Sequence, residues 1–133
     1  MSSLQKLILQ IDQMMAQLTK LYPDNGDLKK FQIGFDAVRL NPMFILQNFM
    51  LYVYPHKDKI MAGDESFFLN NDYAEETGNN QEYMFKALRL KELWQNRMND
   101  TVKETMKKYF KVFIVLAEQA TIEKTGLSQN KNS

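Results

Sequence analysis

The apolar residues near the start of the chain recur with heptad spacing, at alternating intervals of three and four residues: Leu4, Leu7, Ile11, Met14, Leu18 and Leu21. Such a seam predicts a helix over residues 3–21. Ser2 and Gln5 have the spacing of a capping box, in which each side chain bonds the other residue's backbone N–H. We expect a core helix of a bundle, with a coiled-coil dimerisation helix as the alternative.

Helical periodicity continues in the next two segments. A turn signal at residues 23–26 precedes a helix that we expect Asp27 to cap, with one apolar face made by Leu28, Phe31, Phe35 and Val38. Asn41 and Pro42 then have the residue types of an N-cap and a first helical position. The helix that they start is apolar nearly all round as far as Tyr54, which is typical of the centre of a domain. An exposed apolar face used for a partner is the alternative.

Pro55 and Gly63 mark two breaks after that apolar helix. Proline lacks a backbone donor, so Pro55 ends or kinks the helix, and residues 55–62 can restart it. Gly63 supplies a C-terminal stop. Asp64 can then cap a short turn that carries the apolar residues 67–69, and residues 70–80 form a polar, acidic segment that we expect to be an exposed loop.

Two more helices complete the predicted fold. One runs from near residue 80 to about residue 98, and the other starts at a second capping-box pattern, Thr101 and Glu104, and ends at Gly126. We predict an all-α fold, a single-domain bundle of about five main helices with one or two short helical turns and a central apolar helix. It occupies residues 1–126, and residues 127–133 are expected to be a disordered tail.

Opposite charges are separated along the second half of the chain, although the net charge is only +1. Residues 64–82 hold six acidic residues and no Lys or Arg, whereas residues 86–111 hold eight basic and three acidic residues. Because local fields steer partners more than net charge does, each block is a candidate binding surface.

Residues suited to catalysis are scarce. The chain has no cysteine and a single histidine, His56, next to Pro55 and Lys57 in an expected solvated helix start. No nucleophile elbow, zinc-binding H-E-x-x-H or phosphate-binding glycine loop occurs. The acidic loop does not match a calcium-binding loop, because Gly78 falls at the wrong place. We therefore predict no enzyme activity, no catalytic residues, no metal and no cofactor.

The acidic block suggests a protein docking site. Its candidate residues are Asp64, Glu65, Phe67, Phe68, Asp72, Glu75 and Glu76. Two alternatives stay open: the two carboxylates at 64 and 65 favour a helix start while the phenylalanines anchor it to the core, or the acidic loop folds over the basic face of the same chain. In the first alternative the segment is scaffolding, and in the docking hypothesis it presents an exposed phenylalanine.

The basic block suggests a nucleic-acid face on the last two predicted helices. Its candidate residues are Lys86, Arg89, Lys103, Lys107, Lys108 and Lys111. Lys103, Lys107 and Lys111 follow one another at intervals of four residues, so they form one stripe that phosphate groups could contact. The alternative is the solvated polar face of an amphipathic helix, and no nucleic-acid-binding signature is present.

Part of the chain resembles a known group of proteins. Residues 54–60, then Asp64-Glu65-Ser66-Phe67-Phe68-Leu69 and Asp72-Tyr73, and later Leu90-Lys91-Glu92-Leu93-Trp94 and the aromatic helix 109–117, are similar to segments of small uncharacterised helical proteins of giant nucleocytoplasmic DNA viruses. The resemblance covers about residues 44–118 and departs at His56, where Tyr is usual, and at Gly63, where a basic residue is usual. It implies a viral protein of unassigned role and no catalytic residues.

These observations lead to one main functional expectation. We expect a non-enzymatic protein-interaction module that binds through the acidic block or the first helix, with a nucleic-acid-associated protein as the alternative. A protein partner is expected, and a homo-oligomer through the first helix is a further possibility. No segment is long and apolar enough to span a membrane, so we expect no membrane partner. The absence of cysteine fits a reducing compartment, and we expect an intracellular protein, in host cytoplasm or viral factory if it is viral.

Overall fold

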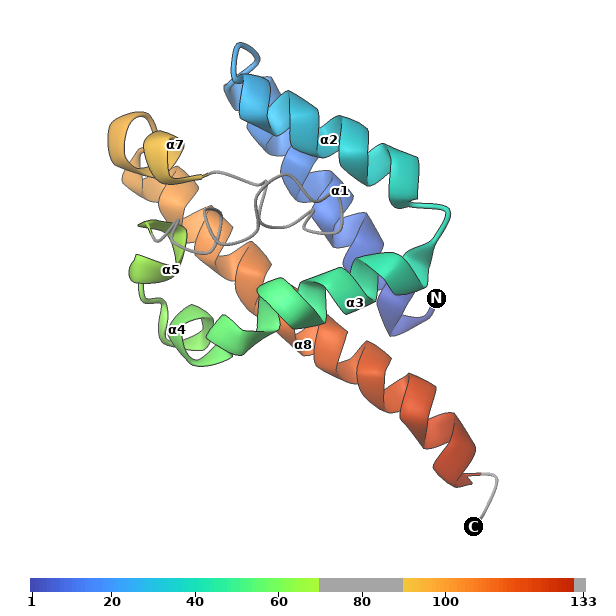
Figure 1. Ribbon diagram of the computed structural model, residues 1–133. Coiled ribbons are helices and arrows are strands. Elements are labelled where there is room, and N and C mark those ends of the chain that lie inside the picture. The colour runs from blue at the N-terminus through green and yellow to red at the C-terminus, as the bar shows by residue number, and fades with distance from the viewer. Residues whose placement is uncertain (70–89, 131–133) are drawn as a thin grey trace.

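The computed structural model describes residues 1–69 and 90–130, with side chains as far as Lys124. Its elements in chain order are α1 (Ser3–Leu21), α2 (Gly26–Val38), α3 (Pro42–Tyr52), the 3-10 helix η1 (Tyr54–His56), α4 (Lys57–Ala62), α5 (Ser66–Leu69), α7 (Lys91–Asn96) and α8 (Asp100–Asn130). All of these elements are helical, which confirms the predicted all-α single-domain bundle (Figure 1).

Helices α1 and α8 run antiparallel and make the most extensive helix–helix contact of the bundle (Figure 1). The predicted capping box starts α1, since Ser2 Oγ accepts a hydrogen bond from Gln5 N at 3.1 Å and Gln5 Oε1 accepts one from Ser2 N at 3.0 Å. At the same end of the pair, Ser3 N donates to Glu123 Oε1 of α8 at 3.3 Å. The register between the two helices is therefore fixed at the first turn of α1.

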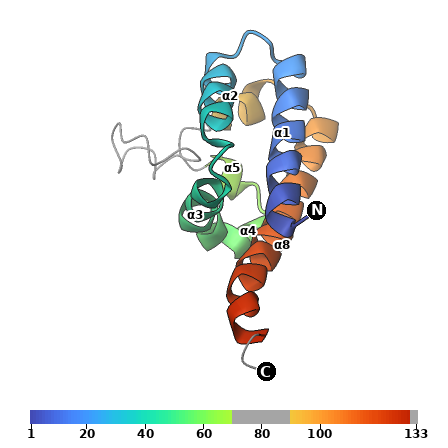
Figure 2. The same cartoon turned by 90° about the vertical axis from the view of Figure 1, so that its right-hand side faces the viewer.

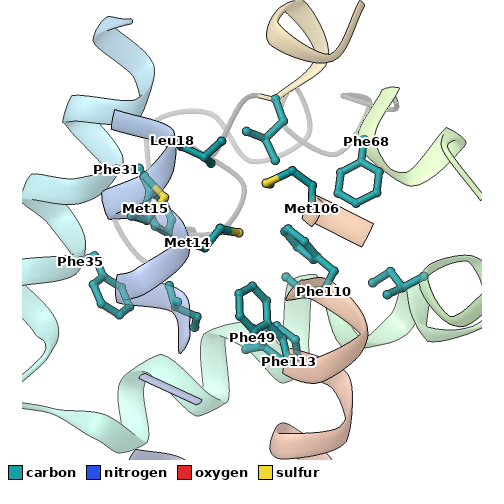
Figure 3. Packing of buried hydrophobic residues seen from close by; sticks show 14 of the residues in the cluster. Met14, Met15, Leu18, Phe31, Phe35, Phe49, Phe68, Met106, Phe110 and Phe113 are labelled. Atoms are coloured by element: carbon teal, nitrogen blue, oxygen red, sulfur yellow. The ribbon is translucent and has the colours of Figure 1, made fainter. Parts of the chain in front are cut away.

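Four of the six residues of the heptad seam of α1 lie in the core, whereas Leu4 is partly buried and Leu21 is exposed. Leu7, Ile11, Met14 and Leu18 are buried. Figure 3 shows Met14 in the space between the two helices, with Phe49, Phe110 and Phe113 close by. Burying a side chain of this size stabilises the fold by about 1.5–3 kcal/mol relative to leaving it in water. The prediction of a core helix is confirmed, and this seam is not available as a coiled-coil dimerisation surface.

The turn into α2 differs by one detail from the sequence expectation. Asn25, not Asp27, is the N-cap, because Asn25 Oδ1 accepts the hydrogen bond from Leu28 N at 2.9 Å. Both residues have suitable side chains, and the one nearer the turn at Pro23 makes the bond. The predicted apolar face is confirmed, since Leu28 and Phe35 are buried and Phe31 with them.

Helix α3 starts as predicted, with Asn41 as the N-cap and Pro42 in the first turn. It packs against α1, α2 and α8, so it lies among three other helices of the bundle. Ile45 and Phe49 are buried, whereas Leu51 is 63% exposed. Helix α3 is therefore apolar on nearly all sides, but only one of its sides is buried.

The breaks predicted at Pro55 and Gly63 are confirmed. Helix α3 ends before Pro55, the chain makes the turn η1 and α4 restarts the helical path. Gly63 ends α4 with φ of 71°, in the left-handed region that glycine enters without steric penalty. These two breaks let the chain turn sharply and bring α5 against α8.

The last two helices correct three expectations. Leu90 is not helical and α7 begins at Lys91, so the helix predicted from near residue 80 does not run on through Leu90; its first part lies outside the described residues. Asn99 rather than Thr101 caps α8, because Asn99 Oδ1 accepts from Val102 N at 2.9 Å. Helix α8 continues through Gly126 to Asn130, beyond the predicted end of the domain.

Candidate functional site

The acidic elbow, Asp64 and Glu65, begins the short helix α5. Asp64 Oδ1 accepts a hydrogen bond from Ser66 N at 2.8 Å, which is the predicted cap. That hydrogen bond from the Ser66 backbone holds the pKa of Asp64 below its ordinary value. The Asp64 carboxylate therefore stabilises the start of α5, which is consistent with a structural role.

The two phenylalanines that follow the elbow are core residues. Phe67 and Phe68 are buried, and Phe68 stacks on Trp94 with 4.2 Å between ring centroids and 5° between ring planes. Phe67 packs edge-on against Phe110 of α8 at 5.4 Å. The hypothesis of an exposed phenylalanine for docking is wrong, because burying these rings against α7 and α8 removes their apolar surface from water.

The acidic elbow meets the basic stripe of α8 within the same chain. Lys107 Nζ lies 3.5 Å from Glu65 Oε1 and 3.2 Å from Glu104 Oε1, and its side chain is only 16% exposed. The hydrogen bond that Lys107 donates to Glu104 raises the pKa of Lys107, with Glu65 adding to the effect. The elbow thus makes an intramolecular contact with the basic stripe, whereas the acidic loop that was expected as the alternative partner lies outside the described residues.

The rest of the stripe does not form one open row of lysines. Lys103 Nζ lies 5.8 Å from the Trp94 ring centroid, in cation–π range. Lys108 is exposed and Lys111 is half-buried. The remaining candidate residues of both blocks lie outside the described residues: Asp72, Glu75, Glu76, Lys86 and Arg89. Among the described residues, Lys103 and Lys107 therefore make contacts within the chain, and Lys108 is exposed to solvent.

A polar cluster around Glu118, further along α8 than the basic stripe, was not predicted from the sequence. Tyr54 Oη donates to Glu118 Oε2 at 2.7 Å, and Lys57 Nζ donates to the same oxygen at 2.5 Å. The hydrogen bond from Lys57 and then that from Tyr54 lower the pKa of Glu118, while the bond to Glu118 raises the pKa of Tyr54. The cluster fastens η1 and α4 to α8, and only the fold brings its members together.

The single histidine takes part in packing. The His56 ring lies 5.4 Å from the Phe67 ring, tilted by 52°. Among the described residues, no group of three or more His, Asp or Glu side chains is placed to hold a metal ion. None of the helices in the part of the chain that the structure describes is long and apolar enough to cross a membrane.

One surface that the sequence argument missed is the outer face of α1 and α8. We give this name to the exposed side of the pair that points away from α2 and α3 (Figure 2). By helical spacing its residues are Gln10, Gln13, Gln17 and Leu21 of α1 with Thr101, Thr105, Lys108, Val112, Val115 and Gln119 of α8. Leu21, Val112 and Val115 are 52%, 42% and 41% exposed.

This outer face contains a hollow at the end where α1 finishes and α8 begins. The hollow has a volume of about 80 Å³, and it is lined by Met14, Gln17, Leu18, Leu21, Thr101, Val102, Thr105, Met106 and Tyr109. Charged side chains border the face at Lys6, Lys20 and Glu104, and Lys108 projects from α8 near its middle. The available signal in the sequence was the glutamine series at 10, 13 and 17, where an exposed helix face usually carries charges.

No known protein family, no curated protein and no solved structure matches this chain.

Proposed function

We propose that the chain is a non-enzymatic protein-interaction module that binds protein through the outer face of α1 and α8. The observation that carries the proposal is the composition of this face, in which exposed apolar side chains and uncharged glutamines and threonines surround a hollow. The centres of protein interfaces are depleted in charge, and apolar side chains there fill pockets on the partner. The uncharged part of the face is the end with the hollow, lined by Gln17, Leu21, Thr101 and Thr105, and Lys108 interrupts it further along α8.

The contacts of the acidic elbow favour this face over the elbow as the docking surface. Asp64 caps α5, and Glu65 lies against Lys107. A partner that bound these carboxylates would first have to replace contacts that the chain already makes. A partner at the outer face would replace fewer contacts within the chain, because Gln13, Gln17 and the two valines are exposed.

Site-specific photo-crosslinking in the cells that make the protein tests the proposal. A photoreactive side chain at Gln13, on the outer face, is expected to yield protein adducts, whereas the same probe at Lys30, exposed on α2, is expected to yield none. Both positions are exposed on helices, so the probe leaves the fold intact. Equal labelling at both positions, or no protein adduct at Gln13, would overturn the proposal.

A nucleic-acid-associated role is the second candidate, and the adjacent Lys108 and Lys111 on α8 are the observation in its favour. Its test is binding to generic duplex and single-stranded DNA and RNA at about 50 and 200 mM salt, because phosphate contacts are lost steeply over that range. The double variant Lys108→Glu, Lys111→Glu is the comparison, because it leaves the internal contacts of Lys103 and Lys107 in place. Salt-sensitive binding that the variant loses would favour this role, and absence of binding at low salt would exclude it.

The resemblance of residues 44–118 to small helical proteins of giant DNA viruses supports a viral setting for the proposed module. In that setting the partner would be a protein present in the infected cell. Crosslinking from infected and uninfected cells would separate partners supplied by the virus from partners supplied by the host.

A further inference from the structure

We infer that the outer face of α1 and α8 is the contact between two copies of this chain, paired about a two-fold axis that runs parallel to the helices. The inference rests on the proposed function, because it names the partner of the same face. Homo-oligomers with two-fold symmetry are the commonest assemblies of soluble proteins, and each copy then presents the same surface to the other.

The register of the antiparallel pair decides which side chains such an axis would bring together. Ser3 lies against Gln119 and Glu123 at one end of the pair. At the other end, Leu21 and Thr101 line the same hollow. Between these two ends the helices are antiparallel, so residue numbers rise along α1 while they fall along α8. Leu9 is therefore level with Val115, and Lys20 is level with Glu104.

An axis parallel to the helices places α1 of one copy over α8 of the other at the same level. Lys20 of one copy then faces Glu104 of the second, a carboxylate that also accepts a hydrogen bond from Lys107 of its own chain, and this opposite-charge contact occurs twice. Lys108, one turn further along α8, is then level with Ala16 of the other copy. Leu9 and Val115, which are 40% and 41% exposed, face each other in the same way. An axis across the helices would instead stack each helix on its own copy with the ends exchanged, which would bring Lys6 and Lys20 together.

The size of the face suits a dimer of this kind. Helix α1 has 19 residues, so at about 1.5 Å per residue the pair presents a face about 28 Å long. Two helices side by side are about 20 Å wide, which gives a projected area of about 550 Å² on each copy and about 1,100 Å² in all. That total passes the lower bound of about 1,000 Å² for a specific interface.

Charge reversal tests the arrangement directly. Sedimentation of the full chain over a concentration series is expected to show a monomer–dimer equilibrium. Lys20→Glu places two like-charged pairs in the interface and is expected to raise the dimer Kd about 10-fold, and Glu104→Lys is expected to do the same. The double variant exchanges the charges and is expected to return the Kd to within about 2-fold of the original.

Two further variants separate loss of the interface from loss of the fold. Val115→Asp is expected to raise the dimer Kd at least about 100-fold while helical content by circular dichroism stays unchanged, because Val115 is exposed in the single copy. Lys30→Glu on α2 is the matched control for a charge reversal on an exposed helix, and it should leave the dimer Kd unchanged.

Several outcomes would overturn the inference. They are a monomer at all concentrations up to about 500 µM, a dimer that ignores Val115→Asp, and charge reversals that the double variant does not rescue. Failure of the proposed function would appear in the photo-crosslinking experiment instead, as the absence of every protein adduct at Gln13. Adducts at Gln13 to other proteins alone, with a monomer in sedimentation, would keep the proposed function and reject the second copy as partner.

Discussion

The acidic elbow and the outer face of α1 and α8 both involve the long helix α8, yet their side chains are engaged very differently. At the elbow, Asp64 caps a helix, Glu65 lies against Lys107, and the phenylalanines that follow are buried. On the outer face, valine, leucine and glutamine side chains remain exposed. The difference teaches that a conspicuous charge pattern in the sequence need not mark a docking site, because the charges can satisfy one another within the fold.

The largest expected effect comes from removing an aromatic ring next to the elbow. Phe68→Ala should lower the free energy of unfolding by about 3–5 kcal/mol, because it deletes a buried ring stacked on Trp94. Val112→Ala, on the outer face, should change it by less than about 0.5 kcal/mol. Urea denaturation of both variants measures the contrast. A loss below about 1 kcal/mol for Phe68→Ala would return this ring to the candidates for surface docking.

The turn that presents the elbow gives the next largest effect. Gly63→Ala should destabilise the fold by about 1–2 kcal/mol, because φ of 71° is unfavourable for a residue with a Cβ although no atom would clash with it. Gly34→Ala in the middle of α2 is the matched control and should stabilise by up to about 1 kcal/mol, since that site is also free of clashes. Equal effects of the two changes in thermal unfolding would contradict the account of the turn.

The ion pair between elbow and stripe should contribute less. A double-mutant cycle with Glu65→Gln and Lys107→Met should give a coupling free energy of about 0.5 kcal/mol that shrinks as salt is added, because Glu65 is partly solvated. Adding Glu104→Gln to the Glu65→Gln variant measures how much of the lost stability the Glu104 carboxylate otherwise makes up by pairing with Lys107. A coupling free energy of zero at low salt would mean that the elbow carboxylate is free to bind a partner.

The smallest effect is a pH dependence at the Glu118 cluster, a further region whose charges are satisfied internally. The pKa of Glu118 is lowered in the folded chain, first by the hydrogen bond from Lys57. Its contribution to stability is therefore present above the unfolded-state pKa and is lost as the pH falls through the lower folded-state pKa. Glu118→Gln should reduce stability at neutral pH by about 0.5 kcal/mol and flatten the loss between about pH 5 and pH 2. An unchanged acid profile would contradict the assignment.

Local signals in the sequence predicted much of the fold. The heptad seam and the Ser2–Gln5 capping box give the observed bounds of α1, because periodicity and cap agree on the same start. Pro55 and Gly63 act through the backbone alone, so their effects on chain direction are readable without knowledge of tertiary contacts. Local features were predicted correctly where one signal marked the position without a competing one.

Competing local signals produced the errors in the helix boundaries. Asn99 and Thr101 both have cap side chains, and the sequence does not show which one will meet a free backbone N–H. Gly126 was expected to end α8, but a glycine inside a helix costs only about 1 kcal/mol relative to alanine. The helix passes through it to Asn130.

The candidate sites were harder to predict than the helices because they depend on long-range contacts. Glu65 and Lys107 are far apart in the sequence, and only the packing of α5 on α8 brings their charges within 3.5 Å. The outer face of α1 and α8 was missed for the opposite reason, since glutamine and threonine are unremarkable one at a time. They become a surface only when two antiparallel helices place them side by side.

The most direct test of the central claim compares the two regions in one experiment. The photoreactive side chain at Gln13 of the outer face and the same side chain at Glu65 of the elbow would be compared in cells that make the protein. The account predicts protein adducts, including the chain's own dimer, from Gln13 and none from Glu65. Adducts from Glu65 alone would contradict it and would place the docking site at the acidic elbow.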